Sequence, residues 1–378
     1  MNFQDKLTYF SGYLLCLIPF TLLTGPFLPD LIISLICLYF LFISFRYKLW
    51  LYYKNYFFYF FFIFSSYLIT RSIFSEFIFI SLEASLFYFR FGIFSLAIWF
   101  LLNHNKNLIK IFTIILFITF LIAIIDGYFQ FIFNKNIFGL TVIGDLEGTR
   151  MTLLLNDKSI LGGYLVRLFP LLFGLILLNY QKSNIGMLAA FISLILVDVL
   201  VFLSGERTAI GLMLIFTILV IILIGKFRIL RLIALSISII IIVIITTNNN
   251  EIMDRNINQT IAQLNIPQNT NTNVNTDTNN PYIFSKTHDS IFKTAYNMYF
   301  QNKLFGIGPK LFREFCKNNN YNKFHVDSEE YELACNTHPH NSYIQLLAET
   351  GIVGAFFIFL AFSLISINFM RFIYKKYF

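Results

Sequence analysis

Long apolar runs recur along the whole chain, and they limit what it can fold into more than any other feature. Of the 378 residues, 57% are hydrophobic and only 13% are charged. A run of about 18 or more apolar residues is long enough to cross a bilayer as a helix, whereas a soluble domain carries far more charge. We therefore predict an all-α fold, a polytopic transmembrane helical bundle of about 10–12 spans.

The predicted spans follow one another closely until a long polar stretch interrupts them. They lie at 10–25, 28–45, 56–70, 84–102, 108–131, 159–178, 184–203, 208–225, 229–246 and, after the polar stretch, within 340–370. The chain therefore divides into transmembrane helices over 1–246, a large loop over 247–337, and a final span within 338–378. Inside the loop, THDSIFKTAYNMYF has apolar positions at helical spacing, which predicts a helix.

The positions of Lys and Arg set the predicted orientation. Basic residues fall in alternate short loops, which marks those loops as cytoplasmic: Lys6, Arg46, Lys48, Lys54, Lys106, Lys110, Lys182, Lys226, Arg228, Arg231, Arg371, Lys375 and Lys376. The net charge of +8 is thus mainly a topology signal. The soluble segments show no basic patch with interleaved aromatic residues, so the charge does not argue for nucleic acid as a partner. The segment 134–158, the turn 204–207 and the loop 247–337 then face the other side, which is the periplasm in a Gram-negative cell.

Three polar residues are expected on that outer side, at the ends of spans. Arg150 follows the fifth span, Arg207 opens the eighth, and His340 opens the last hydrophobic region. Guanidinium groups form forked hydrogen bonds with phosphate oxygens, so arginines on one face suit a pyrophosphate. Taken alone, each arginine also has a plainer interpretation, Arg207 as an interfacial side chain and Arg150 as a loop residue.

Four further charges fall inside the predicted spans, and they are Arg90, Asp126, Arg167 and Asp198. Charges at membrane depth are costly, and they either pair with one another or line a functional pathway. The sequence leaves both interpretations open.

The residues around His340 predict a neutral imidazole. Pro339 suits the first position of a helix, with His338 or Thr337 as its cap. His340 is then expected in the first helical turn, where the positive end of the helix dipole disfavours imidazolium and leaves a base. The alternative is a capping or interfacial histidine.

The cysteines suggest one disulfide and no metal site. Cys316 and Cys335 both lie in the outer loop, where the compartment permits disulfides, whereas Cys16 and Cys37 lie within spans. The chain has no CxxC or Cys/His ligand spacing, so we expect no structural zinc. We predict that Cys316 and Cys335 pair, two unpaired thiols being the alternative.

The segment HNSYIQLLAETGIVG resembles the signature of the O-antigen ligase and O-antigen polymerase superfamily, which is His-Asn/Ser/Gln, nine residues, then Gly-x-x-Gly. His340, Asn341, Gly351 and Gly354 fit this pattern. The two glycines are expected to end the short helix and to allow a kink or close backbone packing. SGERTAIGLMLI, which contains Arg207, resembles the family's arginine motif at the start of a span.

Two weaker similarities complete the resemblance, which covers the chain from about 115 to 365. RMTLLLNDKSILGGYL, from Arg150 onward, resembles the family's arginine segment before a small-residue helix start. KLFGIGPKLF resembles its Gly-x-Gly turn, here Gly306 and Gly308. Where the family commonly shows an arginine upstream of an aromatic residue, this chain has His288. The candidate substrate-binding residues are thus Asn341, His338, Arg167 and His288.

The resemblance implies a metal-independent glycosyltransferase without a cofactor, a multi-pass protein of the bacterial inner membrane with its active site facing the periplasm. The implied donor is a glycan on undecaprenyl pyrophosphate. The acceptor is a lipid A core sugar for a ligase, or another lipid-linked repeat unit for a polymerase, and the His-Asn motif favours the ligase. Arginines would hold the pyrophosphate and His340 would act as general base, and a single displacement would invert the anomeric centre. A transporter of lipid-linked sugars is the alternative from another class, but no repeat of broken helices favours it.

Overall fold

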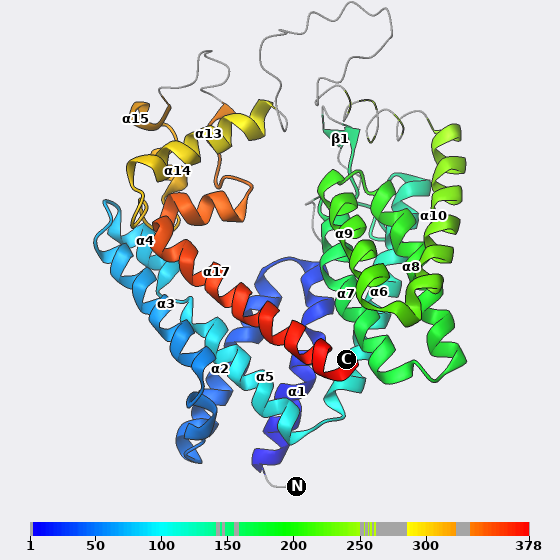
Figure 1. The fold of residues 1–378 in the computed structure, drawn as a ribbon, viewed down its shortest axis with the longest axis horizontal. Coiled ribbons are helices and arrows are strands. Elements are labelled where there is room, and N and C mark those ends of the chain that lie inside the picture. Colours follow the sequence, from blue (N-terminus) through cyan, green and yellow to red (C-terminus); the bar gives the residue numbers. More distant parts are fainter. Residues whose placement is uncertain are drawn as a thin grey trace, which may run out of the picture. The chain divides into compact units, whose positions relative to one another are not determined.

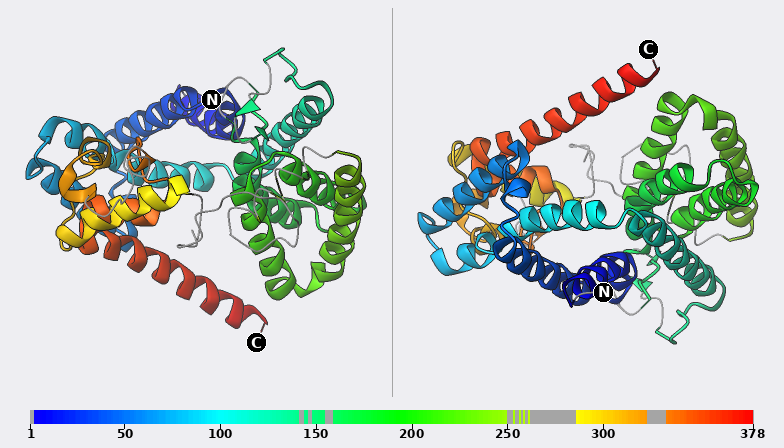
Figure 2. Two further views of the ribbon diagram at one scale, coloured as in Figure 1. Left: turned by 90° about the horizontal axis from the view of Figure 1, so that it is seen from above. Right: turned by 90° about the horizontal axis from the view of Figure 1, so that it is seen from below.

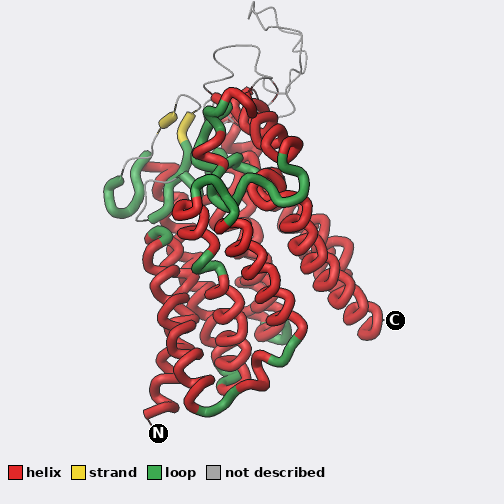
Figure 3. Tube along the Cα trace, turned by 90° about the vertical axis from the view of Figure 1, so that its left-hand side faces the viewer, coloured by secondary structure: helices red, strands yellow, loops and turns green. Residues whose placement is uncertain are grey.

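The fold is almost entirely helical. The structure, a computed structural model, describes residues 3–140, 144–145, 148–154, 159–249, 253, 256, 258, 261, 286–322 and 333–377. In this part of the chain the strands are β1 (Gly144–Asp145) and β2 (Gly148–Thr149), an antiparallel pair coloured yellow in Figure 3. The all-α class predicted from the sequence is confirmed.

The helices follow the predicted spans closely. Nine helices among the described residues are long and apolar enough to cross a membrane, and α9 is shorter. Together they account for the predicted spans. One span differs in form, since residues 78–104 are divided into α4 (Ile78–Ser85) and α5 (Phe89–His104). The last span begins at Ser342.

Contacts between residues group the chain into two compact units, each made of two separate stretches of sequence. The division predicted from the sequence, into 1–246, 247–337 and 338–378, describes the order of segments along the chain and not this packing. Unit 1 comprises residues 1–43 and 97–262, and unit 2 comprises residues 44–96 and 263–378.

Unit 1 is a bundle of long apolar helices. It contains α1 (Phe3–Thr21), η1 (Leu22–Thr24), most of α2 (Phe27–Arg46), the end of α5, α6 (Leu108–Phe133), α7 (Leu161–Tyr180), α8 (Asn184–Leu203), α9 (Arg207–Leu223), η3 (Gly225–Phe227) and α10 (Arg228–Asn248). Helix α8 contacts α6, α7, α9 and α10 (Figures 1 and 2). The buried rings of Phe120, Phe169 and Phe173 lie in the core of this bundle.

Local capping sets several helix ends. The side chain of Ser183 accepts a hydrogen bond from the Gly186 amide at the start of α8, and Asn134 ends α6 in the left-handed conformation. Both residue types are favoured at these positions. The boundaries of these spans thus depend on single polar residues between apolar runs.

A buried ion pair joins α8 to α10. Asp198 accepts hydrogen bonds from both terminal nitrogens of Arg231, at 2.5 and 3.0 Å, and Arg231 is fully buried. Arg231 also contacts Thr217, and Ser238 donates to Asp198. The assignment of Arg231 to a cytoplasmic loop is therefore wrong, because its charge is neutralised inside the bundle by an aspartate 33 residues away. For Asp198 this supports the structural interpretation.

Unit 2 combines membrane-spanning helices with the described part of the loop 263–337. It contains η2 (Trp50–Tyr53), α3 (Tyr56–Ile73), α4, the start of α5, α13 (Lys286–Gln301), α14 (Phe312–Phe315), α15 (Asn319–Asn322) and α17 (Ser342–Tyr377). Helix α13, predicted from THDSIFKTAYNMYF, contacts α17. Its residues Ile291, Ala295 and Met298 are buried in a small core with Phe312 and Ala348. Apolar spacing on α13 thus anchors the loop to the last span.

Helix α17 is broken at Gly351, whose φ is 64° and ψ is −169°. A break inside a span leaves backbone groups that must find other partners. The segment 303–308, which ends in the Gly-x-Gly turn, provides them through four hydrogen bonds. Before the break, the carbonyls of Ala348 and Glu349 accept from the amides of Ile307 (2.9 Å) and Gly308 (2.8 Å). After the break, the amides of Ile352 and Val353 donate to the carbonyls of Lys303 (2.8 Å) and Leu304 (3.2 Å). We call this arrangement the turn–kink interlock.

Helix α3 completes the turn–kink interlock. The Tyr67 hydroxyl donates to the Thr350 carbonyl (2.5 Å). Nη2 of Arg71 donates to the Gly306 carbonyl (2.6 Å), and its Nε donates to Phe305 O (2.9 Å). Two polar side chains of a span thus satisfy carbonyls that the break and the turn leave open.

The four glycines of the two motifs permit this close approach. A Cβ at Gly351 would overlap the Leu304 carbonyl, and a Cβ at Gly306 (φ 67°) would lie 2.5 Å from the nitrogen of Thr350. Gly308 has φ 118°, and a Cβ at Gly354 would overlap the Thr350 side chain. The kink and close packing expected from the sequence therefore depend on backbone contact between two distant segments.

Candidate active site

The arginine motif of unit 1 forms a tight turn between two helices. Ser204 ends α8, Gly205 takes φ 72°, and Glu206 precedes α9, which Arg207 opens. The Glu206 amide donates to the Ser204 hydroxyl (3.4 Å). This places Glu206 and Arg207 side by side at the start of α9, at the position predicted for Arg207.

Backbone hydrogen bonds bring three segments together at this turn. The Met151 amide donates to the Ser204 carbonyl (3.4 Å), and the Leu161 amide donates to the Met151 carbonyl (3.5 Å). Arg150, which is half-buried, is thereby held beside the 204–207 turn and the start of α7. Residues 156 and 157, which belong to the same family-like segment, lie outside the described residues.

The carboxylate of Glu206 lies at the amino-terminal end of α7. Its Oε2 accepts a hydrogen bond from the Gly163 amide (3.0 Å), and a Cβ at Gly162 would overlap the Ser204 hydroxyl. An anion is favoured at this position by the free amides and the helix dipole. The small-residue helix start noted in the sequence thus makes room for a carboxylate.

Burial raises the pKa of the Glu206 carboxyl. The amides of Gly163 and Gly162 and the charges of Arg150 and Arg167 act in the opposite direction. Arg150, Arg167 and Glu206 therefore form one electrostatic group, to which Arg207 is adjacent. With three guanidinium groups and one carboxylate, this arginine group has positive charge to offer an anion. Sequence reasoning missed Glu206, although it stands next to Arg207 in the motif.

Unit 2 contains a histidine group. The ring centroids of His338 and His340 are 4.3 Å apart, and those of His288 and His340 are 5.7 Å apart. His288 comes from α13, whereas the other two come from the loop before α17. Three of the predicted site residues thus meet within one unit. Among the described residues, no group of three or more His, Cys, Asp or Glu side chains has an arrangement that could hold a metal ion.

The predicted place of His340 in the first helical turn is wrong. The α17 helix begins at Ser342, and Asn341 caps it by accepting hydrogen bonds from the amides of Tyr343 (3.0 Å) and Ile344 (3.2 Å). His340 lies before the cap with a left-handed φ of 55°. Asparagine is a strong N-cap and outweighs the preference of proline for the first position. The side-chain oxygen of Asn341 is therefore engaged in capping.

The pKa of His340 is lowered, in the direction expected, but for a different reason. Partial desolvation of the ring, which stays exposed on one side, is the main cause, and the charges of His338 and His288 add to it. A neutral imidazole is thus favoured by its neighbours rather than by the helix dipole.

Asn336 is a second residue that the sequence did not single out. Its Nδ2 lies 3.0 Å from Nε2 of His340, and it directly follows Cys335. Cys335 forms a disulfide with Cys316, and their Cα atoms are 5.0 Å apart, within the separation that a disulfide can bridge. The loop that carries the histidines is therefore fastened covalently to the end of α14.

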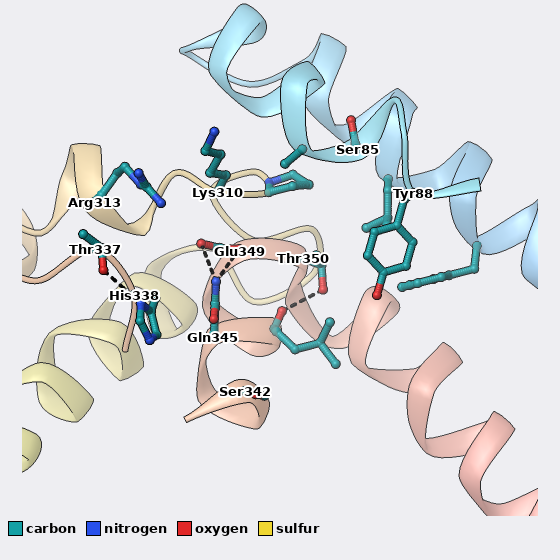
Figure 4. A pocket seen from close by; sticks show the side chains of 15 residues that line it. Ser85, Tyr88, Lys310, Arg313, Thr337, His338, Ser342, Gln345, Glu349 and Thr350 are labelled. Atoms are coloured by element: carbon teal, nitrogen blue, oxygen red, sulfur yellow. Dashed lines mark hydrogen bonds between the residues drawn. The ribbon is translucent and has the colours of Figure 1, made fainter. Parts of the chain in front are cut away.

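A cavity of about 340 Å³ adjoins His338 within unit 2. Its polar lining includes Lys310, Arg313, Gln345 and Glu349, as Figure 4 shows. Glu349 is buried and accepts hydrogen bonds from Nε2 of Gln345 at 3.3 Å. The cavity thus offers hydrogen-bonding groups of both kinds beside the histidine group.

Comparison with known proteins identifies the region that carries most of these residues. Residues 188–359 match the family model for O-antigen ligase. This stretch, somewhat less than half of the chain, is similar to the O-antigen ligase family. The match confirms the superfamily inferred from the His340 motif, and it contains the Arg207 turn, the Gly-x-Gly turn and the histidine group. Arg150 and Arg167 lie outside the matched residues. No curated protein and no solved structure matches the chain.

Proposed function

We propose that the protein is an O-antigen ligase, which transfers a glycan from undecaprenyl pyrophosphate to a sugar of the lipid A core. The observation that carries this proposal is the histidine group within the matched stretch. There, partial desolvation of the His340 ring and the charges of two neighbouring histidines lower its pKa, which favours the neutral base. A neutral imidazole can accept a proton from a hydroxyl group, which is the task that glycosyl transfer requires.

The proposed reaction is a single displacement. The acceptor hydroxyl gives its proton to the imidazole of His340 while its oxygen forms a bond with the anomeric carbon of the donor glycan. The bond between that carbon and the pyrophosphate oxygen breaks, and the electron pair leaves with the pyrophosphate. Because the oxygen attacks opposite the leaving group, the anomeric configuration inverts.

The arginine group of unit 1 is proposed to hold the leaving pyrophosphate. The charges of Arg150 and Arg167 act on the Glu206 carboxylate, which accepts the Gly163 amide, and Arg207 is the next residue in the chain. Forked hydrogen bonds from guanidinium groups would stabilise the negative charge that develops as the bond breaks. Arg207→Ala and Arg150→Ala should therefore weaken donor binding as well as turnover. Lysine at either position should restore binding only in part, because the forked geometry is lost.

The remaining polar groups of unit 2 are proposed to receive the acceptor. The cavity beside His338 has room for a sugar, and Gln345 and Arg313 in its lining suit hydroxyl groups. The disulfide between Cys316 and Cys335 supports an oxidising compartment. Together with the basic residues in alternate loops, this favours an inner-membrane protein whose active site faces the periplasm.

Analysis of lipopolysaccharide from a deletion strain tests the proposal. A ligase predicts that all long chains are lost from the core while lipid-linked polymer accumulates. Cores that still carry a single repeat unit would instead show a polymerase. In the purified enzyme, His340→Ala should abolish transfer while donor binding persists, and wild-type rates in this variant would refute the general-base role. Because arginines neutralise the charge in this scheme, added chelator should leave activity intact.

A further inference from the structure

We propose that Asn336 is the positioning residue that makes Nε2 of His340 the nitrogen that takes the proton. This inference rests on the proposed function of His340 and specifies how the loop prepares it. It starts from the amide group of Asn336, whose two ends lie against different partners.

The orientation of the Asn336 amide is fixed by the backbone. Its Oδ1 accepts a hydrogen bond from the Thr337 amide (2.7 Å), and the Thr337 hydroxyl lies 3.4 Å from the same oxygen. A backbone N–H can only donate, so the atom facing it must be the side-chain oxygen. Nδ2 is then the atom that lies 3.0 Å from Nε2 of His340.

This orientation determines the tautomer of His340. An amide nitrogen can only donate a hydrogen bond, so Nε2 of His340 must be the acceptor and carries no proton. The neutral ring then holds its hydrogen on Nδ1. The lone pair that would accept the proton of the acceptor hydroxyl is thus assigned to one atom and aimed by one hydrogen bond.

Asn336 also acts as a substitute for the substrate. The incoming hydroxyl would replace the amide as the donor to Nε2, and the proton would then pass to the same lone pair. Asn336 is held for this role by the disulfide, because Cys335 is its neighbour in the chain. The titratable groups that face His340 are His338 on the same loop and His288 on α13.

Two substitutions separate this role from a purely structural one. Asn336→Ala removes the amide that donates a hydrogen bond to Nε2 of His340. It should lower kcat by about three- to tenfold, the equivalent of one hydrogen bond, and leave the KM for the lipid-linked glycan unchanged. Asn336→Asp has nearly the same shape but can only accept, so Nε2 must become protonated. The acid limb of the pH–rate profile should then move upward by about one unit or more.

Asn318→Asp is the matched control. The side-chain oxygen of Asn318 also accepts a backbone amide hydrogen, that of Asn320, so this variant adds the same charge beside a local backbone donor. It should leave the pH–rate profile where it is. An equal shift in both variants, or no shift in Asn336→Asp, would overturn the proposal.

The tautomer can also be observed without turnover. In protein labelled with ¹⁵N-histidine, the signal that disappears in His340→Ala should show an unprotonated Nε2 in the wild type and a protonated Nε2 in Asn336→Asp. A protonated Nε2 in the neutral wild-type ring would refute the assignment of Asn336 even if His340 is the base. If His340→Ala retains transfer, the proposed function fails instead.

Discussion

Gly351→Ala is expected to be among the most damaging single-methyl additions to this protein. Its backbone lies at φ 64° and ψ −169°, a region that is essentially open only to glycine. Forcing another residue into it costs about 1–3 kcal/mol. The added Cβ would also overlap the Leu304 carbonyl and lie 2.5 Å from the Phe305 nitrogen. Overpacking of this kind costs about 1–3 kcal/mol more.

The expected loss of stability is therefore about 2–6 kcal/mol, the sum of these two costs. Neither neighbour can move easily, because both are backbone atoms of the turn–kink interlock. Gly174→Ala is the matched control, since a Cβ there meets nothing within 4 Å and the residue lies inside α7. Its effect should be neutral or slightly stabilising, because alanine favours a helix over glycine by about 1 kcal/mol.

Thermal unfolding of the two purified variants in the same detergent, followed by circular dichroism, provides the comparison. Gly351→Ala should unfold at a clearly lower temperature than the wild type, and it should also transfer glycan more slowly, because the segment before the kink carries the cap next to His340. Equal unfolding temperatures for Gly351→Ala and Gly174→Ala would show that the interlock contributes no stability.

Three further predictions follow from contacts in the two units. His288→Ala removes a charge, and part of the desolvation, that lower the pKa of His340, so the acid limb of the pH–rate profile should move to higher pH. The control variant His104→Ala should leave the acid limb unchanged, and a limb that stays in place or moves down in His288→Ala contradicts the prediction. Asp198→Ala should cost about 3–5 kcal/mol in thermal unfolding by leaving the Arg231 charge buried alone. Asp198→Leu combined with Arg231→Met should recover most of that loss, and a double variant no more stable than Asp198→Ala would refute the reasoning. The disulfide of the outer loop should protect both of its cysteines from alkylation in unfolded, non-reduced protein, and breaking it should cost about 3 kcal/mol; labelling of both thiols without reductant would exclude the bridge.

The sequence predicts the spans well because apolar length alone decides them. Each run between polar turns became one helix, apart from the division at residues 86–88 and the break of the last span at Gly351. The motif glycines were also predictable, because a Gly-x-x-Gly after a short helix indicates a break. The partner of that break was not, since the Gly-x-Gly turn lies more than forty residues earlier in the chain.

The errors arose where two local rules compete or where a partner is distant. Pro339 and Asn341 each mark a helix start, and the stronger cap decided the boundary. Arg231 follows a basic loop in the sequence, yet its partner lies on another helix. Glu206 and Asn336 act through residues on neighbouring segments, so no spacing in the sequence could show their contacts.

The turn–kink interlock has a consequence for the order in which the protein can be assembled. Arg71 on α3 binds the carbonyl of Gly306, which follows it by 235 residues. Synthesis proceeds from the amino terminus, so α3 enters the membrane long before the turn exists. Until then its guanidinium group has the Phe74 carbonyl of its own segment but lacks the carbonyls of Phe305 and Gly306. The carboxyl-terminal end of α3 is therefore expected to reach its final packing only after the turn and α17 have been made.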